Sequence, residues 1–144
     1  MDLCGEVRIA APPASVWGAL NDTDVLRACI RGCESIERLS DTELVAKMSA
    51  KVGPLKARFN TDLYLSNLDP PRSYTLSGEG RGAVGFARGS ADVSLEENAG
   101  VTILRYTGTM QIGGKLARVG ARLLDRAVRK VFHGFFANLV ARFA

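Results

Sequence analysis

The sequence of 144 residues is poor in the groups that most metal sites and disulfide frameworks need: it has three cysteines and one histidine. Cys29 and Cys33 are four residues apart, but two thiolates need further ligands, and only Cys4 and His133 are left as soft donors. Few cysteines, odd in number, are typical of a protein kept in a reducing compartment. We therefore expect no metal, no cofactor and no disulfide framework, and we interpret the cysteines as small buried hydrophobes.

Long apolar runs are also missing. No stretch of about 18 uncharged apolar residues could form a transmembrane helix. The N-terminal stretch MDLCGEVRIAAPP lacks the basic region and long apolar segment of a signal peptide. With 47% apolar and 24% charged residues, the composition suits one globular domain over residues 1–144. We expect a soluble protein of the cytoplasm.

Positive charge is concentrated at one end of the chain. Residues 113–144 carry seven basic side chains against the single carboxylate of Asp125, a net charge of +6. The remaining residues carry twelve basic and fourteen acidic side chains, a net charge of −2. An asymmetry of this kind bears on partners and says nothing about fold.

The first 30 residues predict one strand and two short helices. Leu3, Val7 and Ile9 alternate with polar residues, which indicates a strand over about 3–10 with one buried face. The prolines at 12 and 13 suit the first turn of a helix that ends before the sequence NDTD. Asp22 or Thr23 can cap a second short helix over about 23–29.

From Cys33 onward the apolar residues alternate with polar ones in six successive segments. Turn sequences separate these segments at 40–42, 53–54, 69–71, 80–85 and 97–100. Short connections join antiparallel neighbours. We therefore expect a seven-stranded antiparallel sheet in which each strand has one apolar face.

The last segment, 113–144, predicts one long amphipathic helix of about 28 residues, about 42 Å in length. The apolar face of a sheet must be covered, so we expect this helix to lie in the concave side of the sheet. The predicted fold class is α+β: a strand, two short helices, six strands and a long helix.

This order of elements is that of the helix-grip fold of the START-like (SRPBCC) superfamily. The stretches APPASVWGALND, LRACIRGCESIE, VGPLKARF and MQIGGKLARVGARLL closely resemble the CoxG family of carbon monoxide dehydrogenase subunits. The resemblance extends from Glu6 to about Phe136. It implies an accessory protein of a molybdenum hydroxylase, with a role in membrane recruitment or in electron delivery to quinone. One departure is Arg31, which precedes Gly32 where family members usually have proline, and makes this loop more basic.

The residues offer little for catalysis. His133 has no acidic residue three or four positions away on its helix. The strand carboxylates all fall on the polar side of the alternation, namely Glu6, Glu43, Asp62, Glu79, Asp92 and Glu96. We expect no enzymatic activity, with two alternatives left open: a cyclase-like or hydratase-like enzyme that uses the same cavity, and a structural subunit of an oligomeric assembly.

A lipophilic small molecule, a lipid or quinone-like compound, is the ligand that the apolar faces would suit. Glycines at 113, 114 and 120 are costly in a helix and suggest a cavity or entrance at its start. The candidate lining residues are Trp17, Met48, Phe59, Phe86, Tyr106, Met110, Leu116, Gly120 and Leu123. We place Phe86 at the tip of a flexible glycine-rich loop, as a gate or as an inward-packed side chain. The alternative is that side chains fill the interior completely.

The end of the predicted long helix has more apolar side chains than one sheet can cover. The candidate contact residues are Arg126, Arg129, Lys130, Phe132, Phe135, Phe136 and Phe143. Three kinds of cover suit them: an anionic bilayer surface at the inner face of the membrane, a second copy of the chain, or a partner protein. No motif supports a nucleic-acid partner.

Overall fold

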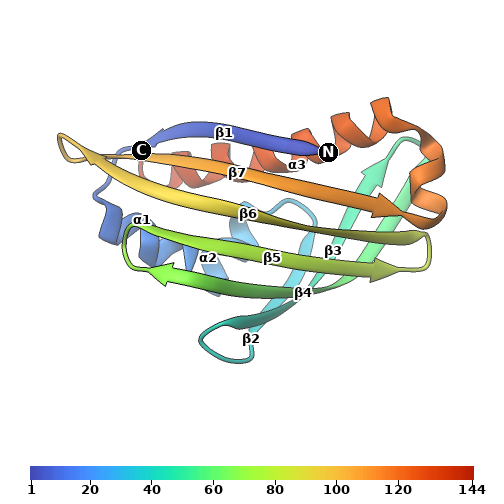
Figure 1. The fold of residues 1–144 in the computed structure, drawn as a ribbon, viewed down its shortest axis with the longest axis horizontal. Helices are drawn as coiled ribbons and strands as arrows, with labels where there is room; N and C mark the ends of the chain where they lie inside the picture. The colour runs from blue at the N-terminus through green and yellow to red at the C-terminus, as the bar shows by residue number, and fades with distance from the viewer.

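In the computed structural model, which describes residues 1–144, a curved sheet holds the last helix on its concave side (Figure 1). The elements are β1 (Asp2–Ile9), α1 (Pro13–Leu20), α2 (Thr23–Cys29), β2 (Cys33–Arg38), β3 (Glu43–Val52), β4 (Leu55–Asp69), β5 (Ser73–Gly82), β6 (Gly85–Asn98), β7 (Val101–Gly113), the 3-10 helix η1 (Gly114–Val119) and α3 (Ala121–Arg142). The order in the sheet is β1-β7-β6-β5-β4-β3-β2, and all pairs are antiparallel. The predicted fold class, strand count and antiparallel pairing are confirmed.

The two short helices follow directly from their local sequence. Pro13 is the first residue of α1. Proline has no N–H, but the N–H groups of the first turn have no partner within the helix, so no hydrogen bond is lost. The Asp22 side chain caps α2 by accepting a hydrogen bond from the Asp24 N–H at 2.9 Å. Of the two predicted candidates, Asp22 is therefore the cap.

The predicted single helix over the last segment is wrong, because the chain breaks at Gly120. This residue has φ 101° and ψ 151°, a conformation that is essentially restricted to glycine. Before it, residues 114–119 form η1, and after it α3 has 22 residues, a length of about 33 Å. Gly113 ends β7 and does not begin a helix.

Two glycine substitutions are expected to have effects of opposite sign. A Cβ added at Gly120 or at Gly134 would meet nothing within 4 Å. The Gly120→Ala change forces a side chain into a disallowed conformation and is expected to cost about 1–3 kcal/mol of unfolding free energy. The Gly134→Ala change lies inside α3 and is expected to add about 0.5–1 kcal/mol. Urea unfolding followed by circular dichroism measures both, and a Gly120→Ala variant as stable as the wild type would contradict this explanation of the break.

Most of the buried apolar residues form two separate clusters. The larger cluster joins α1, α2 and the second half of α3 to β1, β5, β6 and β7. The smaller one has four buried residues: Val52, Ala57, Leu116 and Leu124. The part of the concave face between the clusters is the region of interest for function.

Candidate functional site: the concave face and the basic groove

A row of paired residues crosses the middle of the concave face. Leu63 of β4 pairs with Gly78 of β5, Gly78 with Gly89 of β6, and Gly89 with Met110 of β7. Two neighbouring glycines thus lie in the centre of the row. The Leu63 side chain leans over Gly78, where an added Cβ would come within 2.9 Å of it, and an added Cβ at Gly89 would come within 2.3 Å of the Thr109 carbonyl. Leu63 and Met48, on the adjacent strand, are half-buried and belong to neither cluster.

The predicted lining residues are divided between the two ends of this face. Trp17, Tyr106 and Met110 pack in or against the larger cluster. Leu116 and Phe59 do so at the smaller one. Four others remain, of which Phe86 is described below. Met48 is half-buried in the middle of β3, Leu123 is half-buried beside the β3–β4 turn at Gly53, and Gly120 is exposed before α3.

Phe86 lies elsewhere. It is a residue of β6, paired with Gly113 of β7, so its expected place at a loop tip is wrong. Its ring covers Gly113, where an added Cβ would come within 2.4 Å of the ring, and the Arg88 guanidinium lies 5.3 Å from the ring centroid. Phe86 shares its side of the strand with Arg88 and with exposed Ser90, which places it on the convex face of the sheet. The same alternation in the sequence could have shown this.

Aromatic rings line the end of the concave face next to α1. The Trp17 ring meets the Tyr74 ring edge to face, with centroids 5.3 Å apart. The Tyr106 ring is stacked with Phe136 at 4.5 Å and with Phe132 at 5.8 Å. Tyr74 was not among the predicted lining residues, although its alternation with polar neighbours on β5 marks it as inward-facing.

The ionisable side chains that are buried on this face are phenols and thiols, which are protonated at neutral pH even when free, and burial raises their pKa further. It raises the pKa of Tyr74 to about 12, and it raises the pKa of Tyr106, an effect that Arg129 partly offsets. Burial likewise raises the pKa of the Cys29 and Cys33 thiols. No carboxylate or imidazole is among the buried residues, whose single polar member is Thr102. The buried part of the face therefore carries no charged side chain.

The aromatic side chains of α3 point inward, contrary to expectation. Phe136 is only 8% exposed, and Phe132, Phe135 and Phe143 pack against the larger cluster. None of the large apolar side chains that are exposed belongs to α3: they are Met1, Leu39, Tyr64 and Leu68. The prediction that this end of the helix needs a further apolar cover is therefore wrong.

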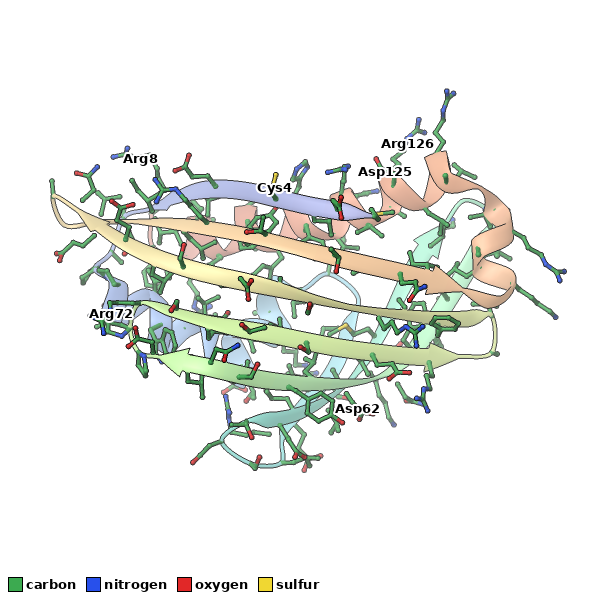
Figure 2. All side chains as sticks on the ribbon, in the orientation of Figure 1. Cys4, Arg8, Asp62, Arg72, Asp125 and Arg126 are labelled. Carbon is green, nitrogen blue, oxygen red and sulfur yellow. The ribbon has the colours of Figure 1, made fainter.

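The solvent side of α3 forms a basic surface groove of about 870 Å³ with the loop between α2 and β2. We call it the basic groove; its lining residues are Arg31, Arg122, Asp125, Arg126, Arg129, Lys130, His133 and Gly134. Figure 2 shows Arg126 projecting away from the sheet on the first turns of α3. The predicted contact residues Arg126, Arg129 and Lys130 all line the groove, whereas the four predicted phenylalanines do not.

No cluster of three or more histidine, cysteine, aspartate or glutamate side chains has the geometry to hold a metal ion. None of the helices combines the length and the apolar character that crossing a membrane requires.

Comparison with solved structures places the chain in a known group of folds. A conserved protein from Geobacillus kaustophilus is 26% identical with a TM-score of 0.92, over 99% of this chain and 95% of that one. A START superfamily protein from Mycobacterium smegmatis is 9% identical with a TM-score of 0.73, over 99% and 96% of the two chains. The Zhui aromatase/cyclase from Streptomyces sp. R1128 is 15% identical with a TM-score of 0.71, over 99% and 92%. The two last similarities, at low identity, show the START-like fold.

Sequence comparison gives the family. No curated protein matches the chain. The family model for CoxG, a subunit of carbon monoxide dehydrogenase, matches residues 5–144, nearly the whole length. The chain therefore belongs to the CoxG family of carbon monoxide dehydrogenase subunits.

Proposed function

We propose that this protein is a non-catalytic accessory protein that binds a lipophilic molecule, a lipid or quinone-like compound, on the concave face beneath α3. The observation that carries the proposal is the incomplete burial of side chains in the middle of that face. Met48 and Leu63 lie on the concave side of their strands but remain half-buried, and the row that contains Leu63 has glycine at two successive strands. A core filled by its own side chains would bury these residues.

The chemistry of the face favours an apolar ligand. Apart from Thr61, its half-buried side chains are apolar, and burial raises the pKa of its phenols and of the Cys29 thiol. Binding would therefore draw on apolar area removed from water, about 25 cal/mol per Å². No carboxylate or imidazole is buried on this face to serve as a general base, which favours binding over catalysis.

Family membership supports the role as an accessory protein. A member of a family of carbon monoxide dehydrogenase subunits would act beside a molybdenum hydroxylase of that type. A bound quinone would let it assist electron delivery, and a bound lipid would let it assist recruitment to the membrane. The protein would then work at the cytoplasmic face of the membrane, as a peripheral component.

A quinone titration tests the ligand. Trp17 is the only tryptophan and packs on the larger cluster, so its fluorescence reports on the concave face. Menaquinone-4 is expected to quench it saturably. Menadione has the same ring without the isoprenoid chain, and we expect it to bind at least about tenfold more weakly, since each buried methylene contributes about 0.8 kcal/mol.

Equal quenching by the two quinones, or a linear response without saturation, would contradict the proposal of a lipophilic site. The role beside the hydroxylase has its own assay: the rate at which a purified carbon monoxide dehydrogenase reduces menaquinone-4, with and without this protein. An unchanged rate would count against electron delivery and leave the ligand site standing.

A further inference from the structure

We propose that the basic groove is a docking site for an acidic segment of a partner protein. The inference rests on the proposed function for the existence of such a partner, and it moves the contact surface from the phenylalanines of α3 to the opposite side of the helix. The occupant is defined by chemistry: a stretch of Asp and Glu side chains presented by a folded protein.

The first observation is an excess of unpaired cations. Five basic side chains line the groove against one carboxylate. Arg129 pairs with that carboxylate, Asp125, at 2.9 Å. The other four, namely Arg31, Arg122, Arg126 and Lys130, take part in none of the ion pairs of the molecule. Charges of one sign lining a concave surface attract ligands of the opposite sign.

The second observation is that this charge pattern works against the helix that carries it. Arg122, Arg126 and Lys130 follow one another at spacings of four, so that like charges are neighbours on one side of α3. Arg122 also lies in the first turn, where the helix dipole disfavours cations, and no acidic residue is present there. Carboxylates supplied by a partner would offset both effects.

The third observation is that the wall opposite α3 is fixed in place. The end of α2, just before the loop that carries Arg31, is tied to α3, because the Asn138 side chain donates a hydrogen bond to the Cys29 carbonyl at 2.9 Å. The loop itself is tied to β3, because the Ser49 N–H donates to the Gly32 carbonyl at 2.8 Å. The groove is therefore formed before any partner arrives, which lowers the entropy lost on binding.

The character of the surface favours a protein over a bilayer. An interfacial helix inserts an apolar face between lipids, and basic residues alone give weak, reversible attachment. The large apolar side chains of α3 are turned toward the sheet, and Phe136 and Leu139 are buried there. The basic groove thus offers charge and hydrogen-bond donors with no apolar residue to insert.

Charge reversal tests the proposal with a defined probe, a fluorescein-labelled peptide of ten glutamates, by fluorescence anisotropy. The groove variant is the double change Arg31→Glu and Arg126→Glu. The matched control is Lys47→Glu and Lys56→Glu, which alters net charge equally at exposed positions outside the groove. We expect the groove variant to bind at least about tenfold more weakly than the wild type, and the control to bind within about threefold. The wild-type affinity should fall steeply with added salt.

An equal loss of affinity in both double variants would overturn the proposal, because it would show attraction by net charge alone. Vesicles of phosphatidylcholine with phosphatidylglycerol form the second arm. A second result would also overturn the proposal: the wild type sediments with these vesicles, the groove variant does not, and both bind the peptide equally. That result would identify the groove as a membrane contact. Menaquinone-4 titration of the groove variant should match the wild type, so a failure of docking and a failure of the ligand site give different results.

Discussion

Replacing Phe136 by alanine is expected to lower the free energy of unfolding by about 3–5 kcal/mol, the range for loss of a buried aromatic ring. The Phe136 ring is 8% exposed and lies between two others: its centroid is 4.5 Å from that of Tyr106 and 5.0 Å from that of Phe135. Removing it leaves a cavity that the neighbouring rings fill only in part. Urea unfolding followed by circular dichroism measures the loss.

His133→Ala is the matched control, because His133 is exposed on the same helix and lines the basic groove. We expect it to change stability by less than about 0.5 kcal/mol. A Phe136→Ala variant that unfolds at the wild-type urea concentration would show that this ring is not part of the core. Such a result would restore it as a contact residue.

Phe136 is a core residue in the structure, whereas the sequence pattern predicts a contact residue, and the reason lies in what periodicity can predict. Counting apolar positions around the helix suggested more apolar surface than one flat sheet can cover. The sheet is curved, and α1 and α2 close its end, so side chains such as Val16 and Cys29 join the cluster that receives the phenylalanines. How far a sheet coils, and what closes its ends, depends on contacts distant in sequence that periodicity does not contain.

The break before α3 is not predictable from the sequence pattern, for a related reason. Leu116 and Leu123 are seven residues apart, so an amphipathic pattern continues across Gly120 as if the helix did. A single glycine in such a pattern is ordinary. Its backbone angles, which make it the end of one element and the start of another, follow from the packing of η1 on the β3–β4 hairpin, where Leu116 meets Val52 and Ala57.

The strands, by contrast, were predictable nearly residue by residue. Each has one buried face, so a period of two is imposed on the sequence, as in β3, where buried Leu44 and Ala46 flank half-buried Val45 and precede exposed Lys47. The order of β2 to β7 follows because short turns leave antiparallel neighbours as the simplest pairing, whereas the pairing of β1 with β7 joins distant parts of the chain and was not predicted. For the candidate site, the alternation predicts which strand residues face inward. It does not predict the space between those residues and α3, which depends on where the helix begins.

Filling that space is expected to remove the ligand. Met48→Trp places an indole ring in the middle of the concave face, between the two clusters, and should lower retention of a lipophilic molecule at least about tenfold. Lys47→Trp is the matched control: the same residue type is introduced one position away, on the exposed face of β3. It should leave retention unchanged.

Native mass spectrometry of the protein purified without detergent, followed by solvent extraction, is the most direct measurement. The wild type and Lys47→Trp are expected to carry an extractable isoprenoid quinone or lipid, and Met48→Trp is expected to show the bare mass. A bare mass for the wild type, or a molecule retained equally by Met48→Trp, would contradict the central claim that the concave face binds a lipophilic ligand.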